Sequence, residues 1–151
     1  MSIWAAPYKR IQQMNEVFAD TSGWASGFVR TELYHSLAAA FLRQWQADGT
    51  LVVTTNYVIN EVSALLTSPL RVPRPQQIAI LDAIRTASWV EIVHIAPDLD
   101  EAAYILFKNR PDKLWSLVDC ASFVVMQQRG IVSAFTNDHH FEQAGLARLL
   151  K

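Results

Sequence analysis

The segment VFADTSGW (Val17–Trp24) decides the fold of this chain, because a short apolar run stops there at an acid followed by small polar residues. This pattern predicts a buried strand that turns directly into a helix. Asp20 then lies at the carboxyl end of the strand. An aspartate at such a junction often only caps the helix, so helix capping and ligand binding are both open for Asp20 taken alone.

Short apolar runs alternate with helical patterns along the rest of the chain. Further strands are expected at 51–54, 90–95 and 132–135, with the tail through Leu149 as a candidate fifth, and helices at 33–48, 56–66, 75–85, 97–109 and 114–128. Gly49 and Gly130 follow two of these helices as C-caps would. The alternation predicts an α/β layered fold with a short, mainly parallel sheet. Ligands of such sheets bind at the carboxyl ends of the strands.

Composition limits the classes of function. The chain has 151 residues, of which 51% are hydrophobic and 18% charged, which predicts one globular domain with a substantial core. No apolar run could span a bilayer and the first residues lack a signal-peptide pattern, so we expect a cytoplasmic protein without membrane contact. Cys120 is the only cysteine, which leaves oxygen or imidazole as metal ligands. A net charge of −1 gives no global attraction for nucleic acid.

Two acids fall on helix surfaces where packing does not explain them. Glu61 shares a predicted face with Val58, Val62 and Leu65, although its stem could simply lie along the apolar rim. Asp119 is the only charged side chain in 114–128. An unpaired buried carboxylate costs several kcal/mol, so the charge of Asp119 must be compensated. An ion pair with Lys113 or an arginine is the alternative to a metal ion.

Asp138 ends the 132–135 strand segment much as Asp20 ends the first strand. Two strands that end in an acid at one sheet edge favour metal binding over capping. The hydroxyls of Thr21, Ser22 and Thr136 could hold these carboxylates, or cap turns.

His139 and His140 follow Asp138 directly and mark a helix start, with His139 a candidate contact to a substrate phosphate. Adjacent side chains point in different directions, so we expect at most one of the two in the site. Zinc usually needs more nitrogen or sulfur ligands than the chain gathers. A carboxylate set favours Mg²⁺ or Mn²⁺.

The runs VFADTSGW, NEVSALL, LWSLVDCASFVVM and AFTNDHHFEQAGL, in this order, resemble the acidic motifs of PIN-domain ribonucleases, especially VapC-type toxins of bacterial toxin–antitoxin pairs. The resemblance implies a three-layer α/β/α fold with Mg²⁺ or Mn²⁺ bound by Asp20, Glu61, Asp119 and Asp138. It also implies cleavage of tRNA or ribosomal RNA, inhibition by a cognate antitoxin, and a homodimer.

The expected function is therefore a metal-dependent endoribonuclease in which metal-activated water cuts RNA. Asp20, Asp119 and Asp138 would hold the main cation, and Glu61 would bind a second cation or orient the water. Arg30 and Lys113 are candidate contacts to the RNA backbone. A noncatalytic PIN-like binding or scaffold module remains the alternative, because an intact acidic set permits catalysis without proving it.

Residues 1–16 precede the family-like region, so we expect the PIN domain at 17–151. Either translation starts at Met14, or Trp4 and Tyr8 anchor an extra segment on the surface.

Overall fold

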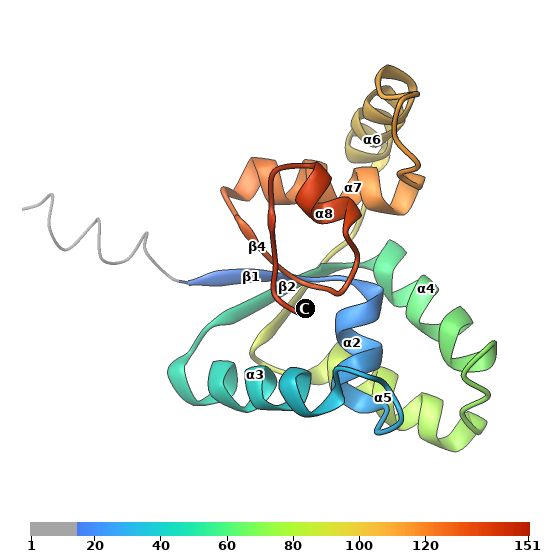
Figure 1. Cartoon of the computed structure of the whole chain (residues 1–151), viewed down its shortest axis with the longest axis vertical. Helices are drawn as coiled ribbons and strands as arrows, with labels where there is room; N and C mark the ends of the chain where they lie inside the picture. The colour runs from blue at the N-terminus through green and yellow to red at the C-terminus, as the bar shows by residue number, and fades with distance from the viewer. Residues whose placement is uncertain (1–14) are drawn as a thin grey trace, which may run out of the picture.

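The computed structural model describes residues 15–151 and is built on a five-stranded sheet in which every paired strand is parallel (Figure 1). Along the sheet the strands follow the order β3-β2-β1-β4-β5. Their bounds are β1 Glu16–Ala19, β2 Leu51–Thr55, β3 Val90–Val93, β4 Ser133–Phe135 and β5 Ala147–Arg148. The fifth strand considered from the sequence is present, next to β4.

Seven helices connect and cover these strands within the described part of the chain. They are α2 Thr21–Phe28, α3 His35–Asp48, α4 Asn56–Thr67, α5 Arg74–Thr86, α6 Pro97–Asn109, α7 Leu117–Arg129 and α8 His140–Gln143. In Figure 1 helices α2, α3 and α5 lie below the sheet and α7 and α8 lie above it, while α6 projects upward from α7. The expected three-layer α/β/α fold is confirmed.

The central strands are apolar because helices cover both faces of the sheet. Phe18, Val52, Val53 and Phe135 are almost completely inaccessible to solvent. The ring of Phe135 meets the indole of Trp45 edge-on at 5.0 Å between centroids. This core fixes the carboxyl ends of β1, β2 and β4 relative to one another.

Two helices begin later than the sequence pattern suggests. Helix α3 begins at His35 rather than at residue 33, and Leu33 is 87% exposed in the turn before it. That turn is held by bonds from the Glu32 N–H to the Val29 carbonyl and from the His35 N–H to the Glu32 carbonyl. Leu33, although it has helical spacing to the apolar residues of α3, is therefore not part of that helix.

Helix α7 begins at Leu117 rather than at residue 114, because Ser116 is its N-cap. Leu114 is 89% exposed before the helix. With this later start, Asp119 is the third residue of α7 instead of lying in the second turn of the expected helix. At this position it can form a capping box with Ser116.

Glycines have two different roles in this fold. Gly49 and Gly130 end α3 and α7 with φ of 78° and 68°, as the C-cap prediction required. Gly23 instead lets α2 pass against β4, since a Cβ atom there would lie 2.0 Å from the carbonyl oxygen of Phe135. This close approach brings the start of α2 beside the end of β4.

Three further expectations concern the chain as a whole. Cys120 is buried, and burial raises the pKa of its thiol to about 11. No helix of the described part combines the length and hydropathy needed to cross a membrane. The alternatives for the N-terminus, a start at Met14 or a segment anchored by Trp4 and Tyr8, concern residues outside the described part of the chain.

Candidate functional site

The carboxyl ends of β1 and β4 meet helices α4 and α7 around one cavity of about 490 Å³. All four predicted acids line this cavity, together with two of the three predicted hydroxyl residues. The complete lining is Asp20, Thr21, Ser22, Glu61, Leu65, Leu114, Ser116, Asp119, Asn137, Asp138, His139 and His140. Asp20 after β1 and Asp138 before α8 therefore bring their carboxylates to one place, as expected for the carboxyl edge of a parallel sheet.

Asp20 is the most deeply buried of the four acids, with 5% of its surface exposed. It occupies the N-cap position of α2, yet its side chain makes no capping hydrogen bond. Burial raises the pKa of its carboxyl to about 7, while the Thr21 backbone and the Thr136 hydroxyl lower it and the charges of Asp119 and Glu61 raise it further. Capping therefore does not account for this carboxylate.

Asp119 is held by a reciprocal capping box at the start of α7. The Ser116 hydroxyl accepts from the Asp119 N–H at 3.0 Å, and Asp119 Oδ2 accepts from the Ser116 N–H at 3.0 Å. Burial raises the pKa of Asp119, opposed by the Ser116 backbone bond and reinforced by the charge of Asp138. The alternative of an ion pair with Lys113 or an arginine is not found among the described residues; the basic group beside Asp119 is His140.

Glu61 projects from α4 into the cavity, on the side of the helix that buries Val58 and Val62. Thr21 donates its hydroxyl to Glu61 Oε1 at 3.1 Å and so links the start of α2 to α4. Burial raises the pKa of Glu61, the Thr21 bond lowers it, and the charges of Asp119 and Asp138 raise it. Glu61 is thus a half-buried member of the acidic group rather than a solvated rim residue.

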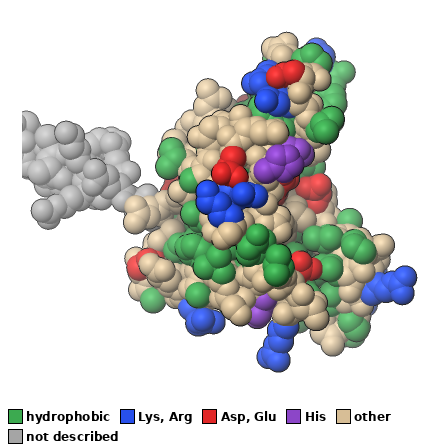
Figure 2. All heavy atoms as spheres, viewed as in Figure 1, with side chains coloured by type: hydrophobic (Ala, Val, Ile, Leu, Met, Phe, Trp, Pro, Cys, Tyr) green, Lys and Arg blue, Asp and Glu red, His purple; other side chains and the backbone are tan. Residues whose placement is uncertain are grey.

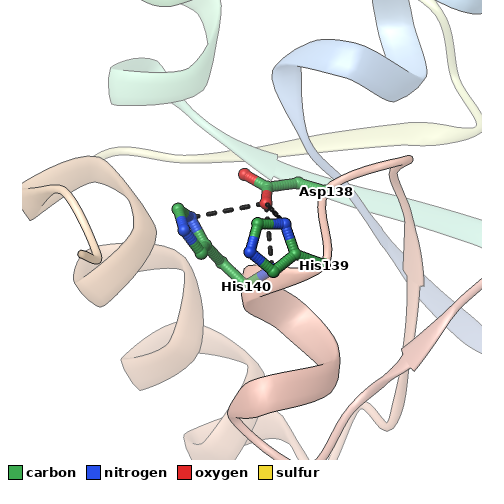
Figure 3. A group of neighbouring side chains, drawn as sticks. All are labelled: Asp138, His139 and His140. Atoms are coloured by element: carbon green, nitrogen blue, oxygen red, sulfur yellow. Dashed lines mark hydrogen bonds and ion pairs between the residues drawn. The ribbon is translucent and has the colours of Figure 1, made fainter. Parts of the chain in front are cut away.

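Asp138 and the two histidines after it form a tight group at the start of α8 (Figure 3). Asp138 Oδ1 accepts from the backbone N–H of His140 at 2.9 Å, which is the bond of an Asx-type turn; the N-cap of α8 is His139, which makes no side-chain capping bond. The same oxygen lies 3.3 Å from Nδ1 of His140 and 3.7 Å from Nδ1 of His139. One carboxylate therefore both holds the turn before α8 and faces the cavity.

A chain of hydroxyl groups positions Asp20 from behind. Thr136 donates to Asp20 Oδ2 at 3.0 Å, and the Ser22 hydroxyl lies 3.0 Å from that of Thr136. Because the Thr136 proton goes to Asp20, Ser22 donates to Thr136 and itself accepts from the Asn137 N–H at 3.0 Å. The Asp138 N–H also donates to Thr136. These bonds tie β1, α2 and the loop after β4 into one unit.

The donor set fits a divalent cation. Within residues 15–151 no lysine or arginine forms an ion pair with any of the four carboxylates; the only basic partners are His139 and His140. The pKa values of Asp20, Glu61 and Asp119 are all raised. Buried carboxylates that repel one another and lack a fixed counter-charge are typical of an oxygen-ligand metal site.

The structure does not bring every predicted residue to this cavity. Arg30 lines a separate groove with Phe28, Leu70 and Arg71. Lys113 is absent from the cavity lining, although its neighbour Leu114 is part of it. His139 does line the cavity, with 66% of its side chain exposed.

Sequence reasoning missed Ser116 and Asn137, and the expectation that at most one of His139 and His140 lies in the site was wrong, since both line the cavity. Ser116 could have been found from its spacing to Asp119, since a serine three residues before an acid is the pattern of a capping box. His140 carried a weaker signal, because two adjacent histidines cannot be ranked without knowing where the helix starts.

Residues 17–146 match the PIN domain. The chain belongs to the PIN-domain family. It is 32% identical over 133 residues to a protein described as the 23S rRNA-specific endonuclease VapC20 in two strains of Mycobacterium tuberculosis, which covers 88% of this chain and 97% of that protein. The resemblance to VapC-type proteins noted in the sequence is confirmed.

Solved structures agree with this assignment. The crystal structure of Mycobacterium tuberculosis VapC20, described as a sarcin-ricin loop cleaving toxin, superposes with a TM-score of 0.75 at 30% identity and covers 87% of this chain and 96% of that one. FitAcB from Neisseria gonorrhoeae matches with a TM-score of 0.61 at 11% identity over 87% of this chain and 95% of that one. The second match supports the fold alone.

Proposed function

We propose that this PIN-domain protein is a metal-dependent endoribonuclease and the toxin of a toxin–antitoxin pair. The observation that carries the proposal is the convergence of Asp20, Glu61, Asp119 and Asp138 on one cavity without a lysine or arginine partner among the described residues. The likeness to VapC20 over most of both chains supports ribonuclease chemistry. We place its action in the cytoplasm, where its RNA substrate would be.

Asp20, Asp119 and Asp138 would hold Mg²⁺ or Mn²⁺, and Glu61 would bind a second cation or orient the attacking water. When bound, the cation supplies positive charge for the scissile phosphate and lowers the pKa of a coordinated water. The protein orients the carboxylates by hydrogen bonds. The Thr136 hydroxyl donates to Asp20, the Thr21 hydroxyl donates to Glu61, and the Ser116 backbone N–H donates to Asp119. These bonds keep the carboxylates in place before the substrate arrives.

Ribosomal RNA is the first substrate to test, because VapC20 is named for cleavage of 23S rRNA. Purified protein is incubated with ribosomes and, separately, with tRNA, in Mg²⁺, Mn²⁺ or EDTA, and the new 5′ ends are sequenced. We expect cleavage by the wild type that needs the metal, and a loss of roughly 100-fold or more in Asp119→Asn. Asp98→Asn, which removes an acid at the start of α6, is the matched control and keeps full activity.

Two outcomes would contradict the proposal in different ways. Metal-dependent cleavage retained by Asp119→Asn would show that the acids around this cavity are not the active site. No cleavage of any cellular RNA by the wild type would favour a noncatalytic PIN-like binding module. His139, Arg30 and Lys113 remain candidate RNA contacts, of which His139 alone lies at the cavity.

We also propose a cognate antitoxin and a homodimer as assembly partners. Tyr104, Ile105 and Phe107 on the projecting helix α6 each expose between 42% and 45% of their surface, and Figure 2 shows hydrophobic side chains on the outside of this helix. Exposed apolar side chains that lie together favour protein contacts. Light scattering on the purified chain, alone and with the product of an adjacent small gene, tests both partners.

A further inference from the structure

The two histidines at the start of α8 have different environments although they are adjacent in the chain. The His140 side chain is 19% exposed, and its Nδ1 atom lies 3.3 Å from Asp119 Oδ2 and 3.3 Å from Asp138 Oδ1. The His139 side chain is 66% exposed, and among the acids of the cavity it forms an ion pair with Asp138 alone, at 3.7 Å, while its ring lies 4.5 Å from that of His140. Figure 3 shows both rings beside the Asp138 carboxylate. His140 is therefore the histidine that faces two acids at once.

Hydrogen bonding does not explain the position of the His140 ring. Its Nδ1 atom is buried and has no hydrogen-bond partner of acceptable geometry among the described residues, despite the two nearby carboxylates. A buried polar atom left unpaired costs about 1–3 kcal/mol. The atom lies close to two carboxylate oxygens without a hydrogen bond of good geometry to either, so a cation could be shared among them in place of a proton.

The distances from Nδ1 to each acid are those of neighbouring ligands of one cation. Ligand atoms bind Mg²⁺-sized octahedral ions at about 2.1 Å, which places neighbouring ligand atoms about 3.0 Å apart. The separations of 3.3 Å from Nδ1 to each carboxylate oxygen are close to this spacing. The backbone bond from His140 to Asp138 further fixes the ring relative to one of these acids.

We propose that His140 donates Nδ1 as a ligand to the cation held by Asp119 and Asp138, and that this nitrogen makes the site prefer Mn²⁺ to Mg²⁺. This inference rests on the proposed metal-dependent function and specifies the ion. Mg²⁺ is bound by oxygen and keeps several of its waters, whereas imidazole is a ligand of transition metals. A site of four carboxylates alone would discriminate less between the two ions.

Metal binding by the full chain tests the ligand role without any measurement of activity. Mn²⁺ is titrated into metal-free protein while free Mn²⁺ is followed by electron paramagnetic resonance, and Mg²⁺ affinity is obtained by competition. For His140→Ala and His140→Gln we expect Mn²⁺ affinity to fall about tenfold or more, with Mg²⁺ affinity changed less than about twofold. His139→Ala, the matched control on the neighbouring residue, should leave both affinities near those of the wild type.

Pulsed electron paramagnetic resonance gives a direct second measurement. The Mn²⁺-loaded wild type should show the nitrogen modulation of a bound imidazole, which persists in His139→Ala and disappears in His140→Gln. A wild-type spectrum without nitrogen modulation would overturn the proposal even if both His140 variants failed to fold. Modulation that disappears in His139→Ala instead would overturn it equally, since the ligand would then be the other histidine.

Asp119→Asn separates this inference from the proposed function. If Mn²⁺ binds the wild type, is lost in Asp119→Asn and is bound normally by both His140 variants, the acidic site stands and the role of His140 is refuted. If Mn²⁺ fails to bind the wild type, or binds Asp119→Asn unchanged, the metal site of the proposed function fails as well.

Discussion

The buried Asp20 carboxyl makes the metal-free protein less stable as pH rises. Its pKa is raised from 3.8 to about 7, mainly by burial. Between these two values the folded state holds a proton that the unfolded state has released, so the free energy of unfolding falls with increasing pH. The stability is complete below the unfolded pKa and is lost as pH rises through the folded pKa.

The magnitude follows from the size of the shift. One pKa unit corresponds to about 1.4 kcal/mol, so a shift of about three units costs about 4 kcal/mol once Asp20 is ionised. About 3 kcal/mol of this contribution to the free energy of unfolding is lost between pH 5 and pH 8, and the remainder is lost below pH 5. For a domain stable by about 5–15 kcal/mol the change is large enough to measure.

Asp20→Asn should remove this part of the pH dependence. Urea unfolding in EDTA at pH 5 and pH 8 compares the wild type with Asp20→Asn and with Asp82→Asn, which replaces an exposed acid on α5. We expect the loss of unfolding free energy from pH 5 to pH 8 to shrink by about 3 kcal/mol in Asp20→Asn alone. Some loss remains, since the pKa values of Glu61 and Asp119 are raised too.

At pH 8 the same variant should be more stable than the wild type. Its gain is reduced by about 1–3 kcal/mol if the new amide N–H group lacks an acceptor. Equal pH dependence in the wild type and Asp20→Asn would refute the reasoning, because the proton taken up between pH 8 and pH 5 would then belong elsewhere.

Two further predictions concern the frame of the site. Gly23→Ala should lose roughly 1–3 kcal/mol or more of unfolding free energy, because its Cβ would lie 2.0 Å from the Phe135 carbonyl oxygen. In the control Gly27→Ala the nearest atom is the end of a flexible side chain, so thermal melting should show a much smaller loss of stability. Equal losses in the two variants would contradict the backbone clash. Arg148 donates to the Asn137 carbonyl at 3.1 Å, so Arg148→Met should loosen the loop before α8 and weaken Mn²⁺ binding measurably by calorimetry, whereas unchanged affinity would show that the loop holds its shape unaided.

The sequence predicted the fold from features that act locally. The strand ending at Asp20 and the glycine C-caps at Gly49 and Gly130 are set by neighbouring residues, so patterns in the chain show them directly. The convergence of Asp20 with Asp138 was also predictable, since parallel strands bring their carboxyl ends to one edge of the sheet.

The details of Asp119 and His140 depend on where helices begin, and hydrophobic patterns determine that least well. Asp119 was expected to need a compensating partner because of burial alone, and part of that compensation is a hydrogen bond from the Ser116 N–H in the capping box. His140 is the first residue of α8, after His139 as N-cap, and this position places its ring beside Asp119 and Asp138. Contacts between separate helix starts leave no periodic signal in the sequence.

The distribution of arginines shows how the fold keeps the acidic cavity available to a cation. In the described part of the chain Arg129 pairs with Glu16 and Glu91, and Arg148 pairs with Glu142, none of which lines the cavity. Inside the cavity, neutral hydroxyls and backbone N–H groups bind the acids, and the only basic side chains beside them among the described residues are His139 and His140. Such groups fix the position of a carboxylate without cancelling its charge. The pKa values of Asp20, Glu61 and Asp119 are therefore raised in the metal-free protein, because no lysine or arginine of the described residues neutralises these carboxylates.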